Sequence, residues 1–320
     1  MKEQCDHIPV MRNQVLDWIA PKPGGRYLDA TVGLGGHAAG LMERTVGQAW
    51  LLGLDRDVQA LRRAQAQLTS FGQQVTLAQT SFQYFALEAQ KLGWDFFDGV
   101  IVDLGVSSLQ LDSPERGFSF LYDGPLDMRM DPGSGAPPAA QIVNTASCER
   151  LKKIIWEYGE EPMAGRIARA IVSAREQGWI ENTLALARIV ERAYPGKRRA
   201  LARNHPATKT FQALRIEVNS ELQELKNFLH DIIDYLSPGA RIAVISFHSL
   251  EDRLVKHAFK RESSACLCPR EYPVCQCGHT RKLRILTRKP LLPEAEEQQE
   301  NPRSRSAKLR VAERLQEEQA

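Results

Sequence analysis

RYLDATVGLGGH, residues 26–37, joins a short apolar strand to a glycine-rich turn that opens a helix. Glycines let a ligand approach the backbone closely, and the N-terminus of a helix offers free N–H groups. A second apolar run ends in Gly53–Asp57, GLDRD, about twenty residues after the glycines, where an acidic side chain can accept hydrogen bonds from both hydroxyls of a ribose. The pair of motifs predicts nucleoside binding at Gly35, Gly36 and Asp55. The alternative is a tight turn followed by a helix that Asp55 caps.

Apolar runs rich in β-branched residues predict buried, parallel strands in the first third of the chain and near residue 240. The predicted strands are Arg26–Thr31, Ala49–Leu54, Gln74–Ala78, Asp98–Leu104 and Ala240–Phe247. Helical patterns such as Val58–Leu68 lie between them, with apolar side chains on one face. This alternation predicts a Rossmann-like α/β fold with helices on both sides of the sheet.

The alternation stops after Leu104. Residues 112–138 are dense in Gly, Pro, Asp and Ser, as a loop or exposed hinge would be, and helical spacing follows. We therefore predict a helical domain at 114–206, inserted into an α/β domain made of 1–113 and 207–320. The α/β domain is expected to resume with one long helix from about Thr208 to Leu236.

Composition sets the class of protein and the expected compartment. Of the 320 residues 43% are hydrophobic and 25% are charged, values that exclude a disordered, collagen-like or coiled-coil chain. No run approaches the roughly 18 consecutive apolar residues that span a bilayer, and Met1–Pro9 lacks the apolar core of a signal peptide. We expect a cytoplasmic protein that contacts no membrane; the oligomeric state stays open.

The details of the glycine loop favour S-adenosylmethionine (SAM) over a dinucleotide. A dinucleotide site uses G-x-G-x-x-G to seat a pyrophosphate, whereas here the third glycine is missing and His37 follows Gly36. Asp29, just before the loop, suits a cationic amino group better than a phosphate. An NAD-dependent oxidoreductase remains the alternative enzyme, and a zinc-stabilised, non-catalytic RNA-binding protein is the alternative from another class.

Two further side chains are placed by the predicted sheet. Asp103 ends the fourth predicted strand, and ligands of open α/β sheets bind outside the carboxyl ends of the strands. Asp103 should therefore face cofactor and substrate, unless it only caps a helix. Phe82 follows the third predicted strand and could stack on adenine or belong to the core.

Several longer motifs in the chain resemble those of a known enzyme family. The motifs run from residue 7 to about 314, and they are His7–Val10, Leu28–His37, Asp55, Asp103–Gln110, His205–Asn219, Ser246–Asp252 and Asn301–Ser306. Together they resemble the bacterial 16S rRNA cytosine-N4 methyltransferases of the RsmH (MraW) type.

The resemblance implies a class I methyltransferase domain carrying a helical insertion, with SAM as methyl donor. The implied reaction is methylation of the exocyclic N4 of a cytidine in the decoding region of 16S rRNA, so the expected partner is small-subunit rRNA and not DNA. By motif position, the implied SAM contacts are Gly35, Gly36, His37, Asp55, Phe82, Asp103 and Gln110.

A cytosine N4 is a poor nucleophile because its lone pair is delocalised into the ring. Hydrogen-bond acceptors on the amino protons and in-line placement against the methyl group would improve attack. Many amino-methyltransferases place an aromatic residue after the acidic one at this strand end, but here the run is Asp103-Leu104-Gly105-Val106. Asp103 is the candidate catalytic acceptor. The candidate helpers are Ser107, Ser108, His248 and Ser249.

Cations cluster in three places, although the formal net charge is only +3. The first run, Tyr194–Arg215, has no acidic residue and carries Lys197, Arg198, Arg199, Arg203, Lys209 and Arg215. The second is Arg281–Lys289, and the third carries Arg303, Arg305, Lys308 and Arg310. Such clusters neutralise phosphates. We expect RNA contact through them and through the helical domain.

Four of the six cysteines crowd between Cys266 and Cys277, as C-x-C pairs on a Pro- and Gly-rich stretch. Paired thiols could hold tetrahedral zinc, and a reducing compartment disfavours disulfides. The C-x-C spacing is tighter than usual for structural zinc. The sequence leaves zinc open here, and we assign no metal ligand from it.

Overall fold

The computed structural model describes residues 9–196, 199, 204–269, 271–272 and 274–316. The chain divides into two compact units, one formed by Met1–Gly105 with Leu222–Ala320 and the other by Val106–Glu221. His7, Lys197, Arg198 and Arg203, which the sequence motifs and the first basic run include, lie outside the described residues.

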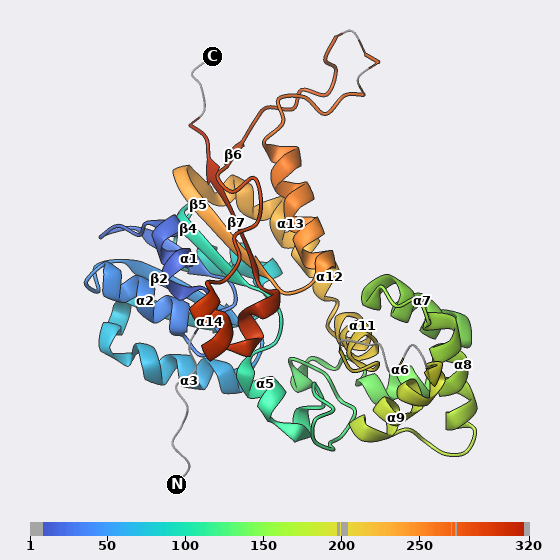
Figure 1. Cartoon of the computed structure of the whole chain (residues 1–320). Helices are drawn as coiled ribbons and strands as arrows, with labels where there is room; N and C mark the ends of the chain where they lie inside the picture. Colours follow the sequence, from blue (N-terminus) through green and yellow to red (C-terminus); the bar gives the residue numbers. More distant parts are fainter. Residues whose placement is uncertain (1–8, 197–198, 200–203, 270, 273, 317–320) are drawn as a thin grey trace. The chain divides into compact units, whose positions relative to one another are not determined.

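The first unit is built on a seven-stranded sheet with the order β3-β2-β1-β4-β5-β7-β6 (Figure 1). The strands are β1 (Arg26–Asp29), β2 (Trp50–Asp55), β3 (Val75–Gln79), β4 (Phe97–Asp103), β5 (Leu236–Ser246), β6 (Leu283–Ile285) and β7 (Lys308–Arg314). β1 to β5 are mutually parallel, whereas β7 runs antiparallel to β5 and to β6. The carboxyl ends of β1, β2 and β4 therefore meet at one edge of the sheet.

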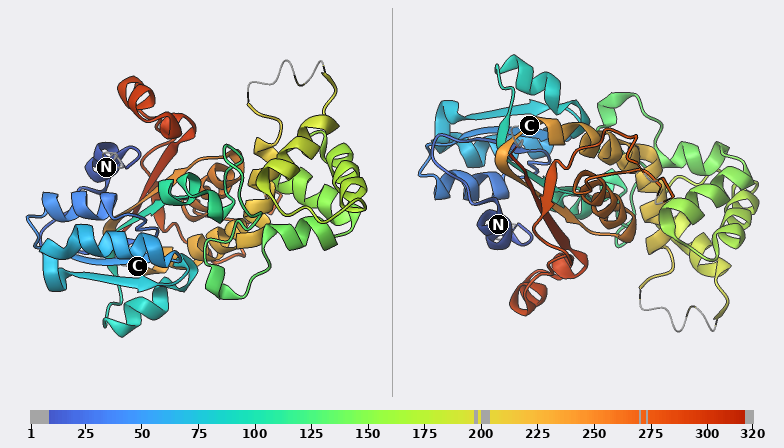
Figure 2. Two further views of the ribbon diagram at one scale, coloured as in Figure 1. Left: turned by 90° about the horizontal axis from the view of Figure 1, so that it is seen from below. Right: turned by 90° about the horizontal axis from the view of Figure 1, so that it is seen from above.

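Helices cover both faces of this sheet (Figure 2). One face carries α1 (Arg12–Ile19), α2 (Gly36–Arg44) and α3 (Val58–Leu68); the other carries α4 (Phe85–Lys91), α12 (Glu221–Asp231) and α13 (Ser249–Glu262). The unit also contains η1 (Thr69–Gln74), η2 (Phe82–Tyr84), η5 (Ile232–Tyr235), α14 (Ala295–Glu300) and η6 (Pro302–Ser306). α3 shows how the sequence decides the packing: Leu61, Ala64 and Leu68 share one helical face and are buried.

The five predicted strands are confirmed to within a few residues, and β6 and β7 were missed. β6 has three residues, and β7 reads KLRVAER, in which charged side chains interrupt the apolar pattern. Both strands nevertheless pair at the β5 side of the sheet, and the interior of β7 is buried. Among the described helices, none has the length and apolar character that crossing a membrane requires.

The second unit is helical and has its own core. It comprises α5 (Ser108–Asp112), η3 (Pro114–Arg116), η4 (Pro132–Ser134), α6 (Ala139–Thr145), α7 (Cys148–Gly159), α8 (Ala164–Arg175), α9 (Thr183–Ala193) and α11 (Thr208–Asn219). Its core includes Leu151, Ile167 and Leu186, one from each of α7, α8 and α9. α7 and α11 pack so closely that a Cβ on Gly159 would lie 2.7 Å from the Lys209 carbonyl oxygen.

The predicted long helix from Thr208 to Leu236 is wrong. Ser220 adopts a left-handed conformation (φ 53°) and separates α11 from α12. The buried side chains of α11, among them Phe211 and Leu214, belong to the core of the helical unit. The helical unit is therefore wider than the predicted 114–206, because it takes in α11 and the turn before α5.

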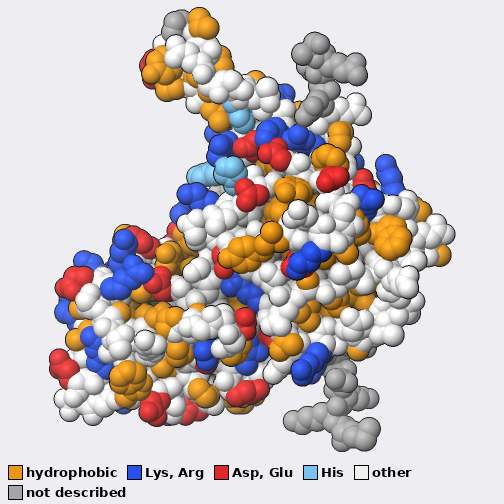
Figure 3. Space-filling view, turned by 180° about the vertical axis from the view of Figure 1, so that it is seen from behind, with side chains coloured by type: hydrophobic (Ala, Val, Ile, Leu, Met, Phe, Trp, Pro, Cys, Tyr) orange, Lys and Arg blue, Asp and Glu red, His pale blue; other side chains and the backbone are white. Residues whose placement is uncertain are grey.

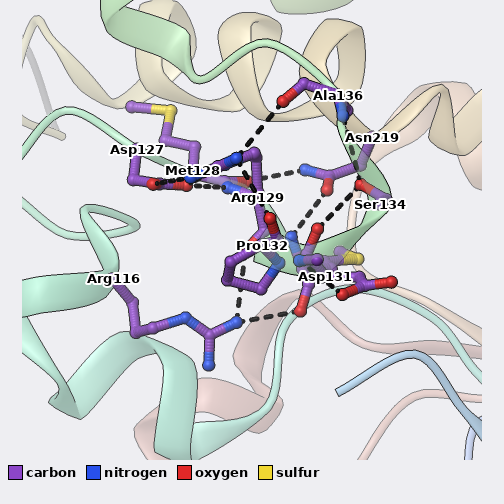
Figure 4. Close-up of polar contacts among 11 residues, drawn as sticks. Arg116, Asp127, Met128, Arg129, Asp131, Pro132, Ser134, Ala136 and Asn219 are labelled. Carbon is purple, nitrogen blue, oxygen red and sulfur yellow. Dashed lines mark hydrogen bonds and ion pairs between the residues drawn. The ribbon is translucent and has the colours of Figure 1, made fainter. Parts of the chain in front are cut away.

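The Gly- and Pro-rich stretch is a loop, as expected, and residues 127–136 within it form a densely bonded turn (Figure 4). The Arg129 guanidinium donates to both Asp127 carboxylate oxygens and to the Ala136 carbonyl oxygen. Asn219 accepts from the Met130 N–H at 2.8 Å and donates to the Met128 carbonyl oxygen at 2.8 Å. Burial alone would raise the pKa of Asp127, but the hydrogen bonds from Arg129 outweigh it and hold that pKa below its ordinary value.

Candidate functional site

The glycine loop between β1 and α2 is held by Asp55. The Gly33 N–H donates to Asp55 Oδ2 at 2.9 Å, and the Asp57 N–H donates to Asp55 Oδ1 at 2.9 Å. Gly35 begins α2 at φ 91°, where a side chain would be strained, and a Cβ on Gly36 would lie 2.1 Å from Pro9 Cγ. The loop is thus fixed in place by β2 before any ligand binds.

Asp29 lies at the end of β1 and is only 1% exposed. Its Oδ1 accepts a long hydrogen bond (3.3 Å) from the Thr31 N–H, and within the described residues its buried Oδ2 has no hydrogen-bond partner. Burial raises the pKa of Asp29 to about 7, against a lowering effect of the nearby His37. Burying a carboxylate without a partner is costly, so this group is arranged for a ligand that brings a positive charge or a donor.

His37 and Asp103 face each other from α2 and β4. His37 Nε2 lies 3.7 Å from Asp103 Oδ2, and the His37 ring is buried. The Asp103 N–H donates to the Thr31 hydroxyl at 2.7 Å, which fixes the end of β4 against β1. Both His37 ring nitrogens and Asp103 Oδ1 lack a hydrogen-bond partner among the described residues. The structure therefore places His37 and Asp103, both predicted from the sequence, side by side. Each keeps polar atoms that are available to a ligand.

Phe82 lies in η2, directly after β3. Its ring is half-buried and meets Phe228 edge-on, with centroids 5.3 Å apart. Nearby, Arg56 forms an ion pair with Glu224 and donates to the Ser81 hydroxyl at 3.0 Å. The core contact fixes the Phe82 ring, while its partial exposure leaves part of it accessible.

Gln110 belongs to the helical unit, whereas the other predicted SAM contacts belong to the α/β unit. It is buried in α5, and its side-chain oxygen accepts from the Ser107 N–H at 3.1 Å. The Ser107 hydroxyl in turn accepts from the Gln110 N–H, so the two residues form a capping box. Ser108 is the first residue of this helix.

His248 begins α13 in a second capping box. Its Nδ1 accepts from the Glu251 N–H at 3.4 Å, and Glu251 Oε2 accepts from the Phe247 N–H at 2.8 Å. Phe247 is an aromatic residue that the motif at the end of β4 did not point to, since it directly follows β5. A Cβ on Gly105 would lie 3.3 Å from its ring, so Phe247 borders the backbone that leaves β4. An aromatic ring thus lies beside the backbone that follows Asp103.

The residues of this site fit SAM. Carboxylates from β1, β2 and β4 stand at one edge of the sheet, and two of them, Asp29 and Asp103, keep buried oxygens without a hydrogen-bond partner in the described chain. A sulfonium and an ammonium group suit such surroundings, whereas the pyrophosphate of a dinucleotide would be repelled. Asp55, half-buried beside the glycine loop, keeps the position expected for a ribose.

The buried Asp29 carboxyl should make the stability of the ligand-free protein depend on pH. Its folded-state pKa is raised to about 7 from an ordinary 3.8, so the folded state binds the proton more tightly and stability falls as pH rises from about 4 through 7. We expect Asp29→Asn to raise the melting temperature by a few degrees at pH 8 and by little at pH 4. Thermal unfolding at both pH values measures this, and an equal shift at both would contradict it.

A sheet of order 3-2-1-4-5-7-6 with an antiparallel β7, and a carboxylate-rich site beside a glycine loop, define a class I SAM-dependent methyltransferase. The chain belongs to the MraW methylase family, whose model matches residues 4–315. Ribosomal RNA small subunit methyltransferase H of Oleidesulfovibrio alaskensis is 57% identical over 309 residues, which cover 97% of this chain and 95% of that protein. The protein of the same name from Maridesulfovibrio salexigens is 58% identical over 308 residues, covering 96% and 95%.

Proposed function

We propose that this chain transfers the methyl group of SAM to the exocyclic N4 of a cytidine in 16S rRNA, in the bacterial cytoplasm. The role of SAM as methyl donor is supported by the buried polar atoms of Asp29, His37 and Asp103 at one edge of the sheet, which have no hydrogen-bond partner among the described residues. The RNA half rests on the near full-length similarity to methyltransferases named for small-subunit rRNA. Membership of the family disfavours the oxidoreductase and the non-catalytic alternatives.

The cofactor-binding residues divide by the part of SAM that each would hold. Asp55 accepts from the ribose hydroxyls, and Phe82 borders the adenine. Asp29 faces the ammonium group, while Gly35, Gly36 and His37 line the methionine portion from the start of α2. Gln110 is kept as a SAM contact on the family resemblance alone.

Asp103 is the proposed catalytic residue. Its carboxylate accepts hydrogen bonds from the cytosine amino group, which favours the pyramidal nitrogen that attacks. SAM supplies the methyl group on a sulfonium centre, so the nitrogen needs no base before attack. The amino proton becomes acidic once the new bond to carbon forms, and the Asp103 carboxylate or water can then take it.

Two of the residues predicted to assist catalysis, Ser107 and His248, already cap helices, and this limits their part in the reaction. The Ser107 hydroxyl caps α5, and His248 Nδ1 caps α13. His37, whose Nε2 lies 3.7 Å from Asp103, is better placed to orient the carboxylate. Asp103 is therefore the group that we assign to the amino protons of the substrate.

Two cations of the predicted RNA-binding runs are unavailable. Arg310 in β7 is 7% exposed and donates to Asp252 at 2.6 Å, so its inclusion in the third run was wrong. Arg215 donates to Glu221 at 2.9 Å and is largely covered, which removes it from the first run. Both side chains serve the fold.

The helical unit offers a better candidate surface for phosphates, a hollow between α7 and α8. It is lined by Lys152, Pro162, Met163, Gly165, Arg166, Arg169 and Pro195. Three of these are exposed cations, and none of the lining residues is acidic. Lys152 and Arg169 approach Gly165 from two sides, at 3.7 and 3.8 Å from where its Cβ would be. Such a surface neutralises phosphates without reading sequence.

Reversing these charges should separate RNA binding from SAM binding. We expect Arg166→Glu with Arg169→Glu to weaken binding of a 16S rRNA fragment about tenfold or more, since each lost phosphate contact lowers affinity and its salt dependence. Filter binding measures the RNA and calorimetry the SAM affinity, which should not change. Arg188→Glu, exposed on α9 of the same unit, is the matched control. Equal weakening by Arg188→Glu would contradict a role for the hollow.

The reaction itself is tested by nucleoside mass spectrometry of 16S rRNA from cells with and without this gene. We expect N4-methylated cytidine to disappear without the gene and to return with the wild-type chain. An unchanged amount in the deletion strain would overturn the proposed function.

A further inference from the structure

The segment between α13 and β6, residues 263–282, leaves the α/β unit as a long exposed loop (Figures 1 and 3). Its base is closed by the Lys282 N–H, which donates to the Glu262 carbonyl oxygen at 2.8 Å, and by a contact of 3.1 Å between His279 Nε2 and the Arg261 carbonyl oxygen. Beyond this base the loop exposes Leu267, Tyr272 and Val274. None of the described residues of the loop is buried, so its outer part has no apolar core among them.

Four cysteine thiols nevertheless converge in that outer part. The sulfur atoms of Cys266, Cys268, Cys275 and Cys277 all lie within 4.8 Å of one another. Cys266 Sγ is 3.4 Å from Cys275 Sγ and 3.8 Å from Cys277 Sγ, and the last two are 3.5 Å apart. Thiols are weak donors and weak acceptors, so mutual contact alone gives little reason for this gathering.

The spacing is that of a tetrahedral metal centre. Zinc–sulfur bonds of about 2.3 Å in a tetrahedron separate the sulfur atoms by about 3.8 Å. A disulfide joins sulfur atoms only in pairs and at about 2.05 Å, so it accounts neither for three mutual contacts nor for their length. The four sulfur atoms enclose the space that one such ion would fill.

Backbone donors complete the arrangement. The Cys268 N–H donates to Cys266 Sγ, the Leu267 N–H to Cys277 Sγ and the Gln276 N–H to Cys268 Sγ, each at 3.3 Å. Hydrogen bonds of this kind stabilise negative charge on sulfur, which is the form that binds a metal. Each C-x-C pair supplies two ligands, so the short spacing that left zinc open in the sequence is compatible with the geometry.

We propose that Cys266, Cys268, Cys275 and Cys277 bind one structural zinc ion. All four coordination positions are filled by protein sulfur, which leaves no open position for catalysis. The ion would link the Cys266–Cys268 part of the loop to the Cys275–Cys277 part. It would thereby fix the shape of a segment whose described residues are not buried. Thiolate ligands favour zinc over magnesium or calcium.

The test is metal analysis of the full-length protein, purified under reducing conditions without chelator. We expect about one zinc per chain by mass spectrometry of metals, and loss of nearly all of it in the double variant Cys266→Ser with Cys277→Ser. Cys148→Ser, which changes a half-buried cysteine of α7, is the matched control and should keep the zinc. Cobalt substitution should give the ligand-field bands of a tetrahedral tetrathiolate site in the wild type and in Cys148→Ser, but not in the double variant.

A folding readout separates metal loss from general damage. The double variant should bind SAM like the wild type, yet limited proteolysis should cut it faster within residues 263–282. Protein without metal, iron in place of zinc, or zinc retained by the double variant would each overturn the proposal. Failure of the proposed rRNA methylation would leave this result unaffected, because no step of the test measures methyl transfer.

Discussion

Asp103→Asn is expected to lower methyl transfer to 16S rRNA by about 10²–10³-fold at saturating SAM, the usual cost of removing one group that stabilises a transition state. Asparagine has nearly the same shape but no negative charge, and its amide nitrogen would face the cytosine amino group as a competing donor. Single-turnover assays with labelled SAM measure the rate, and calorimetry measures SAM affinity on the same sample. A much larger fall in rate than in affinity is the result that a catalytic role requires.

The matched control is Asp95→Asn, an exposed aspartate just before β4, in the same unit but ahead of the strand that Asp103 ends. It should change neither quantity. Unchanged turnover of Asp103→Asn at saturating SAM would remove Asp103 from catalysis. A loss confined to SAM affinity would keep it only as a cofactor contact.

Asp55→Ala is expected to weaken SAM binding by about 10²-fold or more. Two hydrogen bonds from ribose hydroxyls to a charged acceptor are each worth about 1.5–3 kcal/mol. The same change also removes the acceptor of the Gly33 and Asp57 N–H groups, so the glycine loop loses its attachment to β2. Calorimetric titration with SAM or its demethylated product measures the effect.

Asp55→Asn separates these two contributions, because asparagine can still accept one of the backbone hydrogen bonds. It should bind SAM more weakly than the wild type and more tightly than Asp55→Ala. Asp95→Ala serves as the control for loss of a surface carboxylate. Wild-type affinity in Asp55→Ala would contradict the assignment of the ribose to Asp55.

Local patterns were sufficient for the parallel part of the sheet. The interiors of β1, β2 and β4 are mainly apolar, and the strands end in Asp29, Asp55 and Asp103. Because ligands of open α/β sheets bind outside the carboxyl ends of the strands, the sequence by itself predicted that Asp103 faces the cofactor and that Asp55 follows the second strand near the glycine loop. It also predicted a helical insertion after β4, since the strand pattern stops there.

Contacts between segments distant in sequence decided three features that local patterns did not predict: strand β7, the break between α11 and α12, and the bonding of the loop before α6. β7 carries charges that obscure its pattern, and it became a strand because β5 pairs with it and Asp252 neutralises Arg310. The break at Ser220 separates α11, whose buried side chains join the helical core, from α12, whose buried side chains join the core of the sheet. Asn219 bonds to backbone about ninety positions away in sequence, which ties the predicted loop to α11.

The same division holds for function. The sequence by itself determined which residues carry charge, thiol or imidazole and which strand ends present them, because these properties depend on residue type and short spacing. Only the tertiary structure decided that Asp29 is buried with an oxygen that has no partner in the described chain, that His37 lies beside Asp103, and that four cysteine sulfur atoms lie within 4.8 Å of one another. Burial and distance depend on how remote segments pack, so they exist only once the chain has folded.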